Sequence, residues 1–294
     1  MVAREEAQVS DNPARRMWQL FEPLHAVSYF TPEARAASDA LGLRGFWMGY
    51  TAQRIAPLGP VGAEIATAAF FGFHLSRIAR ALPDAWRFTT PTDALQARLA
   101  GVDAALRRLW GEEVLSSPEL VEAAGLAWRA AAGADCAGRV LAAANQALPR
   151  PEPAHLALWQ ASTTLREHRG EGHVAVLVAR RLTPVQAHLI KAAAGEAEPD
   201  VLQEGRRFDD AAWQQGIAEL QQAGLLDADR RLTAAGRDLH ADIECATDAA
   251  ASSPWRHLGD ATDTLATLLA PLTASLVATT FPVPNAIGLL LDAS

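Results

Sequence analysis

The chain has 294 residues and half of them are hydrophobic, which excludes a disordered protein and is enough for two domains or one large intertwined domain. A formal net charge of −8 and a pI near 5.5 argue against a general binder of nucleic-acid polyanions, although a local basic patch remains compatible with both values. Alanine, leucine and arginine dominate and aromatic residues make up only 6%, a composition that favours helix over strand.

Two features bear on the compartment. The only cysteines, Cys136 and Cys245, lie far apart and match no metal-binding spacing, and the N-terminus lacks a charged-then-apolar signal segment. Prolines interrupt the apolar stretch 265–291 before it reaches the roughly 20 residues that a membrane span needs. We therefore expect a cytoplasmic protein without a transmembrane segment.

Cap-and-proline pairs mark the starts of helices along the first half of the chain. Asn12-Pro13 and Thr31-Pro32 each place a capping side chain before a proline in the first helical turn, and Thr90-Pro91 and Ser117-Pro118 repeat the pattern. The almost wholly apolar run 63–73 is typical of a central buried helix. The expected helices before residue 118 are 13–28, 32–42, 45–56, 63–73, 74–82 and 93–110.

The stretch from His168 to Lys191 organises the second half. It predicts a helix that ends near Arg166, a short glycine-bearing loop between His168 and His173, and an apolar helix over 173–181. Its counterpart is the first-half segment 46–60: Phe46-Trp47 and Arg54 stand where Leu158-Trp159 and Arg166 stand in the second half. We interpret this order as an internal duplication, with one repeat over 12–134 and the other over 135–294.

The run after residue 208 predicts a helix, a wing and a further helix. A helix over 211–223 ends in Gly-Leu-Leu, a polar turn carries Asp227 and Asp229, and Thr233 caps the next helix. The segment 111–113 holds the corresponding place in the first half. Short β-wings are therefore expected in both halves.

Several short segments carry a family resemblance that covers nearly the whole chain. They are Gly-Leu-Arg-Gly-Phe-Trp (42–47), Ala-Pro-Leu-Gly (56–59), Phe-Gly-Phe-His (71–74), His-Arg-Gly-Glu-Gly-His (168–173), Gly-Leu-Leu-Asp (224–227), Leu-Thr-Ala-Ala-Gly-Arg (232–237) and Pro-Asn-Ala-Ile-Gly (284–288). The chain resembles winged-helix proteins related to the MarR regulators, and more closely an actinobacterial helix-turn-helix family with a duplicated winged helix. The resemblance implies a mainly α fold of two pseudo-repeated, degenerate winged-helix units with short β-wings, and implies a fold far more than a function.

DNA binding is one hypothesis. The helix that would enter the major groove offers Gln214 and Gln215 but no basic residue, and it begins with two aspartates. Arg230 and Arg231 lie in the expected wing. A protein that neutralises several phosphates would carry more positive charge here, so DNA is a possible but disfavoured partner.

The two histidines of the glycine segment support another hypothesis. If the loop brings His168 and His173 together, they could line a cleft and act as acid or base near neutral pH. The alternative is that one caps a helix and the other packs in the core. A metal site is disfavoured, because the chain has no HExxH motif and no cysteine pair, although His25 or His74 could supply a third ligand in space.

Aromatic walls with a few polar tips suggest a ligand pocket, although aromatic residues at helical spacing are more often core. A carboxylate at Glu64, if buried, would need a partner such as Arg54. The candidate ligand-binding residues are His25, Tyr29, Trp47, Tyr50, Arg54, His74, Trp159 and Arg166.

The leading hypothesis is a protein that binds a small, partly apolar molecule between its two repeats, with acid or base chemistry by His168 or His173. The first alternative is a ligand-responsive MarR-like regulator that binds DNA through its C-terminal half. The second is an interaction protein without a small ligand. The sequence identifies no cofactor, and monomer and homodimer both remain open.

Overall fold

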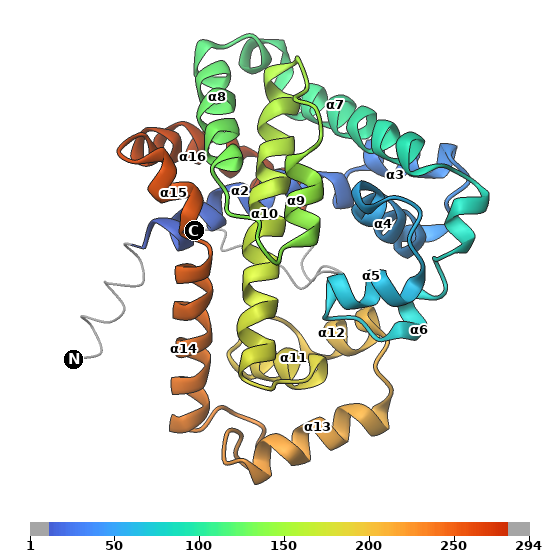
Figure 1. The fold of residues 1–294 in the computed structure, drawn as a ribbon, viewed down its shortest axis with the longest axis vertical. Coiled ribbons are helices and arrows are strands. Elements are labelled where there is room, and N and C mark those ends of the chain that lie inside the picture. Colours follow the sequence, from blue (N-terminus) through green and yellow to red (C-terminus); the bar gives the residue numbers. More distant parts are fainter. Residues whose placement is uncertain (1–11, 282–294) are drawn as a thin grey trace.

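The computed structural model describes residues 12–281, so the segment 284–288 lies outside the described residues. This part of the chain is built from helices joined by short turns (Figure 1). In order they are α2 (Pro13–Phe30), α3 (Pro32–Ala40), α4 (Gly45–Ile55), η1 (Ala56–Leu58), α5 (Ala63–Phe70), α6 (Leu75–Ile78), η2 (Asp84–Arg87), α7 (Pro91–Leu115), α8 (Pro118–Ala132), α9 (Val140–Gln146), α10 (Ala154–Ala179), α11 (Pro184–Ala193), α12 (Pro199–Arg206), α13 (Asp210–Gln222), α14 (Ala234–Ala250), α15 (Ser253–Leu258) and α16 (Ala261–Thr280).

The helix starts that the sequence marked are confirmed, together with their capping bonds. The Asn12 side chain accepts a hydrogen bond from the Ala14 amide, and Thr31, Thr90 and Ser117 cap their helices in the same way. Thr183 forms a full capping box with Gln186 at the start of α11. These bonds satisfy first-turn amides that the helix itself leaves unpaired, so local sequence is enough to fix them.

Helix α10 runs through the middle of the molecule (Figure 1). It packs most extensively against α8, α9, α2 and α14, and the largest hydrophobic cluster joins it to α2, α7, α8, α15 and α16. Trp159 lies at the centre of that cluster and is only 1% exposed. Because this cluster draws side chains from both halves of the sequence, the two halves share one core.

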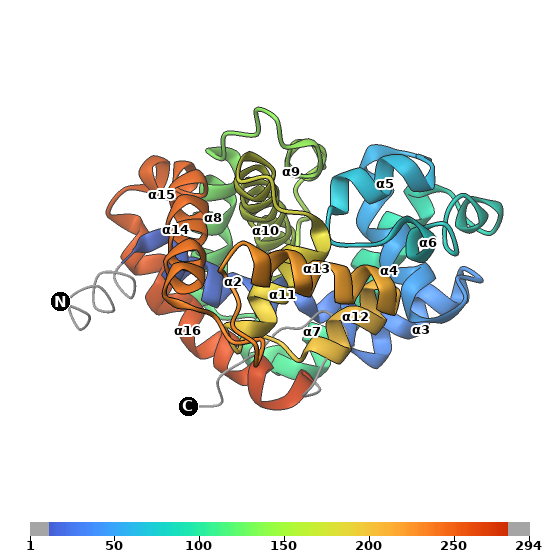
Figure 2. The same ribbon diagram turned by 90° about the horizontal axis from the view of Figure 1, so that it is seen from below.

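A second hydrophobic cluster belongs to a smaller lobe at the lower end of α10. Helices α11, α12 and α13 surround Leu189, Leu202 and Trp213, with Leu226 and Leu232 from the turn that follows α13 (Figure 2). Arg207, Phe208 and Asp209 join α12 to α13, so these two helices form a helix-turn-helix unit packed on α11. We call residues 184–233 the α11–α13 lobe.

The α11–α13 lobe is docked on the segment around α6. The His74 amide donates to the Arg206 carbonyl at 3.1 Å, and the Arg77 guanidinium donates to the carbonyls of Gly205 and Glu204. These bonds join parts of the chain about 130 residues apart in sequence, since Arg77 and Gly205 are separated by 128 positions. The lobe is therefore held to the body on the side opposite α14.

The predicted glycine loop at 168–173 is wrong, because these residues belong to the uninterrupted helix α10. Gly172 lies within 3.3 Å of Ala250 on α14 and 3.4 Å of the Arg139 guanidinium, measured from an ideal Cβ position. The glycine therefore serves close packing between helices, at a cost of about 1 kcal/mol in helix propensity. The glycine that suggested a loop instead allows α14 and the Arg139 side chain to approach α10 closely.

The predicted β-wings are also wrong, because residues 12–281 contain no strand. The mainly α character that the sequence predicted is confirmed. After α13 a single bridge joins Leu226 to Leu232. The Asp227 carboxylate accepts hydrogen bonds from the amides of Asp229 and Arg231, which closes the turn before a ladder can extend. In the first half, the expected wing at 111–113 lies within α7, which is kinked at Gly111.

The expected central burial of 63–73 is wrong as well. Helix α5 ends at Phe70, and only three of its residues are buried, namely Ala63, Ala66 and Phe70. Ile65 is 57% exposed. The apolar run instead lies on the flank of the molecule, and α10 takes the central position.

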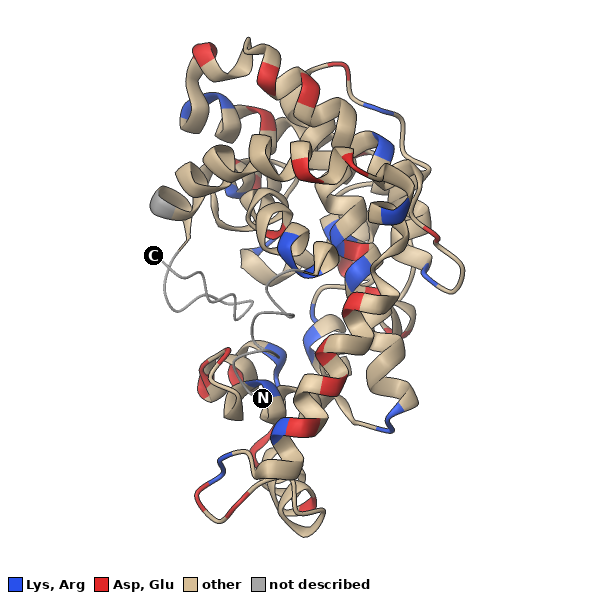
Figure 3. Ribbon diagram, turned by 90° about the vertical axis from the view of Figure 1, so that its left-hand side faces the viewer, with Lys and Arg blue, Asp and Glu red and all other residues tan. Residues whose placement is uncertain are grey.

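Three further observations concern the described residues as a group. None of their helices is long and apolar enough to cross a membrane. Cys136 and Cys245 are both free thiols. Acidic and basic positions are interspersed along the ribbon seen from the side that carries α14 (Figure 3).

Candidate functional site

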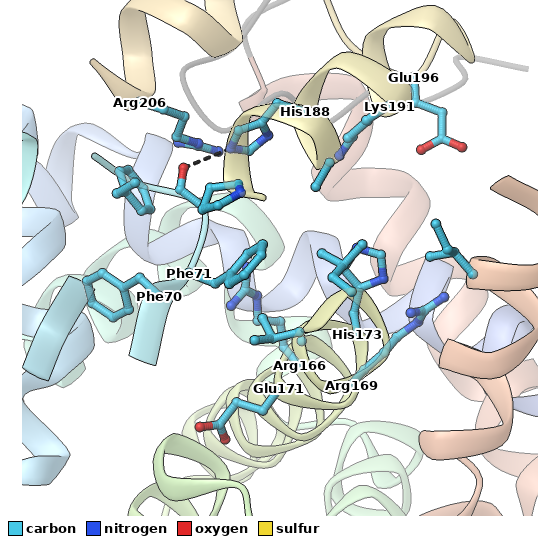
Figure 4. A pocket seen from close by; sticks show the side chains of 18 of the residues that line it. Phe70, Phe71, Arg166, Arg169, Glu171, His173, His188, Lys191, Glu196 and Arg206 are labelled. Carbon is cyan, nitrogen blue, oxygen red and sulfur yellow. Dashed lines mark hydrogen bonds between the residues drawn. The ribbon is translucent and has the colours of Figure 1, made fainter. Parts of the chain in front are cut away.

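A cavity of about 570 Å³ lies where the α11–α13 lobe meets the body. Its walls come from α2, α4, the segment from α5 to Phe73, α10, α11, α12 and α14, and Figure 4 shows side chains of α10 and α11 facing one another across it. The wall combines apolar side chains with many ionisable ones. The ionisable side chains other than tyrosine are Arg15, Glu22, Arg54, Arg166, Arg169, Glu171, His173, His188, Lys191, Glu196, Arg206, His240 and Glu244.

The floor of the cavity is a saturated ion cluster. Arg54 on α4 donates two parallel hydrogen bonds to Glu167 on α10, at 2.8 and 2.9 Å, and one to the Tyr50 hydroxyl. Arg166 donates to the second Glu167 oxygen at 3.0 Å. Burial alone would raise the pKa of Glu167, but Arg54 and Arg166 outweigh it and hold that pKa well below its usual range.

Arg54 therefore pairs with Glu167 and not with Glu64, which is exposed. The pairing predicted as a possibility from their closeness in sequence is wrong. Arg54 also stacks over the Phe70 ring at 4.3 Å, so its guanidinium is fixed on both sides. We call Tyr50, Arg54, Arg166 and Glu167 the floor cluster.

A second ion cluster borders the floor near α14. Arg169 donates to Asp248 at 2.9 Å and stacks over Trp18, and Arg15 pairs with Asp248 at 3.1 Å and with Glu244. The Nε atom of Arg169 is buried and has no hydrogen-bond partner among the residues that the structure describes. A buried donor without an acceptor is costly, and because this atom has almost no accessible surface, the cost falls on the folded chain.

Helix α11 supplies the opposite wall. His188 hydrogen bonds to the Gly72 carbonyl at 2.8 Å, and burial lowers its pKa to about 3 with a further contribution from Arg206. Lys191 lies one turn further along, and its ammonium group makes no hydrogen bond or ion pair with the residues that the structure describes. Burial is the largest influence on the Lys191 pKa and lowers it.

The two ends of this wall are closed by different contacts. At one end Glu196 pairs with His240 of α14 at 2.8 Å, which raises the His240 pKa. At the other end the Arg206 guanidinium lies over the rings of Phe73 and Trp47, at 4.5 and 6.0 Å. The α11–α13 lobe thus touches the body at both ends of the cavity and leaves the space between them open.

Of the residues predicted to bind a ligand, Tyr29, Tyr50, Arg54 and Arg166 line this cavity. His25 and Trp159 lie directly beneath them: His25 bonds to the Tyr29 hydroxyl at 2.9 Å, and the Trp159 indole donates to the His25 carbonyl. Burial, and next Arg166, lower the His25 pKa.

Trp47 and His74 lie outside the residues that line the cavity. Trp47 packs on Phe73 and under Arg206, and so supports the wall from behind. His74 is exposed and caps α6 through a bond from the Ser76 amide. The predicted ligand-binding residues therefore fall into three groups. Some line the cavity, others pack directly behind its wall and form a supporting layer, and His74 lies on the surface.

The structure separates the histidines proposed as a catalytic pair. Five residues advance a helix by about 500°, so His168 and His173 point to different sides of α10. His173 lines the cavity, bonds to Thr247 at 2.9 Å, and has a pKa that burial lowers to about 4. His168 instead contacts Arg139 and the Asp135 carbonyl behind α10, and its pKa is also lowered to about 4, first by burial and then by Arg139.

Metal binding has no support in the geometry of residues 12–281, where no group of three or more His, Cys, Asp or Glu side chains could hold an ion. The histidines considered as third ligands, His25 and His74, belong to the supporting layer and to the surface.

The candidate DNA-reading helix is α13. Gln214 and Gln215 are exposed on it, but Gln215 donates to Glu219 of the same face, and Asp210 accepts from Gln203. Arg230 and Arg231 lie beyond it in the turn, where Arg231 is 3.8 Å from Asp229. The exposed face of the helix is therefore acidic, which opposes contact with phosphates.

Several cavity residues had no place in the sequence-based hypotheses, namely Arg15, Trp18, Glu22, Phe71, Arg169, His188, Lys191, Glu196, His240 and Glu244. Most belong to α2, α11 and α14, which the pattern of aromatic residues did not connect. One signal was present: Arg166, Arg169 and His173 recur at three- and four-residue spacing, as one face of a helix would.

These features define a mainly helical protein with a helix-turn-helix lobe set against a cavity-bearing body. A family model described as a helix-turn-helix family matches residues 14–282, and the chain belongs to this family. A search of curated proteins and a search of solved structures each found no match.

Proposed function

We propose that this helix-turn-helix protein binds a small, partly apolar molecule in the cavity between α10 and α11. The observation that carries the proposal is the cavity itself, with a volume of about 570 Å³ that lies inside the range of small-molecule sites, roughly 300–1,000 Å³. The wall offers apolar contacts from Phe71, Val174 and Ile190 beside polar groups of residues such as His173 and Lys191. This is the composition expected of a site that combines affinity with orientation.

The charges of the wall support the same reading. A folded protein gains little from bringing so many ionisable groups together out of water, because the desolvation penalty offsets much of the pairing energy. The floor cluster is paired, whereas the Lys191 ammonium in the cavity wall lacks a partner among residues 12–281. Such an unsatisfied donor supports a bound acceptor.

The test is binding itself. Native mass spectrometry of freshly purified protein should show a retained small molecule, and a titration with 8-anilinonaphthalene-1-sulfonate should saturate at one site per chain. Ala187→Trp, which fills the cavity from α11, should abolish both signals, while Ala218→Trp on the exposed face of α13 should leave them unchanged. Absence of both signals in the unmodified protein would overturn the proposal.

Acid or base chemistry, if the bound molecule undergoes any, is assigned to His173. It is the histidine of the predicted pair that lines the cavity, and because its pKa is lowered to about 4 it is neutral at pH 7 and able to accept a proton. His173→Asn should then reduce turnover without reducing affinity.

The alternative function is a ligand-responsive DNA-binding regulator. Membership of a helix-turn-helix family and the α12–α13 unit favour it, and the acidic face of α13 opposes it. An electrophoretic shift with random duplex DNA at low salt should show no complex. A shift that weakens in Arg230→Ala with Arg231→Ala, and not in Arg87→Ala, would support the regulator instead.

The finer evolutionary hypothesis is a MarR-like ancestor in an actinobacterium, duplicated into repeats over 12–134 and 135–294. The parallel order of motifs supports it. Superposition of the two segments tests it, and halves without a common helix order would rule it out. A fused duplication could replace a dimer within one chain, so sedimentation should decide between monomer and homodimer.

A further inference from the structure

Lys191 is the only lysine of the chain. All other members of the 26 basic residues are arginines, and every ion pair from a basic side chain other than histidine is made by arginine in the part of the chain that the structure describes. Arginine is the better residue for fixed contacts with carboxylates, because its planar fork is always charged and binds in parallel. What lysine adds is an amine that can lose its proton and act as a nucleophile.

The position of Lys191 suits that property. It lies in the cavity wall on α11 and is half-buried, and its nitrogen has no hydrogen bond or ion pair with described residues. Lys191 faces a cavity whose wall combines apolar side chains, such as Phe71 and Ile190, with charged ones, such as Glu196.

The charged groups with the strongest influence on Lys191 come from α2, α12, α14 and the loop after α11. Arg206 on α12 disfavours its charged form, while Glu196, Glu22 and Glu244 favour it, from the loop after α11, from α2 and from α14. Neutral His188 lies between Lys191 and Arg206 along the wall (Figure 4). Burial is the largest influence, so the net effect lowers the pKa of this amine and increases its neutral fraction at pH 7.

We propose that Lys191 forms an imine with an aldehyde or ketone carbonyl of the molecule that the cavity binds. The inference rests on the proposed function, because it names the chemical class of that same ligand. The amine nitrogen forms a bond to the carbonyl carbon while the C=O π pair moves to oxygen. The oxygen then leaves as water with both amine hydrogens, and a C=N bond remains. No oxidant, reductant or further reactant is needed.

The experiment uses three probes of one shape. 6-Methoxy-2-naphthaldehyde carries the carbonyl, the corresponding naphthalenemethanol lacks it, and the corresponding naphthoate carries a negative charge instead. The full-length protein is incubated with the aldehyde and sodium cyanoborohydride at pH 7, so that hydride converts an imine into a stable secondary amine. Peptide mapping should place the adduct at Lys191, and fluorescence titration should show that the alcohol binds in the same cavity.

Matched variants separate the amine from the cavity. Lys191→Arg keeps the charge and should lose trapping while it retains binding of the alcohol. Lys191→Met serves as a second variant, which is uncharged. Arg87→Lys adds a lysine at a position that is 78% exposed, and this solvated amine should react more slowly than Lys191, because a smaller fraction of it is neutral at pH 7.

Each outcome decides. Trapping at Lys191 together with binding of the alcohol supports the inference. Binding of the alcohol without trapping, or equal rates at Lys191 and at the Arg87→Lys amine, overturns the imine and leaves the ligand cavity intact. Lys191-dependent affinity for the naphthoate without trapping makes Lys191 an anion contact only, which also overturns it. If none of the probes binds, the proposed function fails together with the inference.

Discussion

The floor and the α11 wall of the cavity use basic side chains in opposite ways. On the floor, Arg54 and Arg166 share Glu167, and each guanidinium has a fixed position. On the wall, Lys191 forms no ion pair with a carboxylate of residues 12–281. The paired side chains of the floor stabilise the fold, but their hydrogen-bonding groups are already used and contribute little to binding. The Lys191 amine contributes little to stability and is free to contact a ligand. Different walls of one cavity therefore contribute to stability and to binding.

The largest effect of a single substitution at neutral pH is expected from the floor. Glu167→Gln keeps the size of the side chain but removes the charge shared by Arg54 and Arg166, so it should reduce the free energy of unfolding by about 3–5 kcal/mol, as for other broken buried pairs. Lys191→Met should change it by less than ~0.5 kcal/mol, because no pair is lost. Urea unfolding measures both, and equal losses in the two variants would refute the division between floor and wall.

The next effect is a loss of stability in acid. His168, His173 and His188 have pKa values lowered to about 4, 4 and 3 in the folded protein, below the unfolded value of 6.5. Each is neutral when folded but takes up a proton on unfolding below pH 6.5. Stability is therefore complete above pH 6.5 and falls toward pH 4, by about 1.4 kcal/mol per pH unit for each such group.

His188→Gln isolates one of these groups. The amide can still donate to the Gly72 carbonyl, so the contact between α11 and the body is kept. Between pH 6.5 and 4, the dependence of the unfolding free energy on pH should become less steep by about 1.4 kcal/mol per pH unit, which corresponds to one proton. An unchanged slope would show that His188 is protonated in the folded state.

A smaller effect tests whether residues 168–173 are helical. Gly170 has ordinary space around it, with the Arg166 guanidinium at 3.6 Å from an ideal Cβ, whereas at Gly172 two neighbours lie at 3.3 and 3.4 Å. Gly170→Ala should therefore raise the unfolding free energy by about 0.5–1 kcal/mol, and Gly172→Ala should gain less or lose. Thermal melts compare the two, and destabilisation by Gly170→Ala would favour a loop.

The smallest effect has the opposite dependence on pH. Glu196 raises the pKa of His240, so this pair stabilises the folded state below pH 6.5 and loses that contribution as pH rises through the raised value. The side chains are 23% and 42% exposed, which limits the contribution to less than ~1 kcal/mol. His240→Gln should lower stability at pH 6 and leave it unchanged at pH 9, as followed by urea unfolding.

Local sequence predicted helix starts well and loops poorly, and the two residue types involved explain why. A cap such as Asn12 or Thr31 bonds to an amide two or three residues away, so its role is decided within one turn. Gly170 and Gly172 looked like a loop, but the contact that justifies Gly172 comes from Ala250 and Arg139. No local pattern contains those partners.

The site was predicted in part for the same reason. Tyr29, Tyr50, Arg54 and Arg166 were identified from aromatic and basic spacing and do line the cavity. Glu167 was not identified, although it follows Arg166 directly, because its importance comes from a guanidinium 113 residues away. The uniqueness of Lys191, by contrast, was visible in the composition from the start.

By itself the sequence determined the mainly helical character, the helix starts and a set of aromatic and basic residues with a binding composition. Only the tertiary structure decided that α10 is one continuous helix, that no wing forms after α13, and that α11 faces α10 across a cavity. The physical reason is the distance along the sequence over which each interaction acts. Capping and helical periodicity act within a few residues, whereas charge pairing, burial and cavities depend on segments that meet only when the chain has folded.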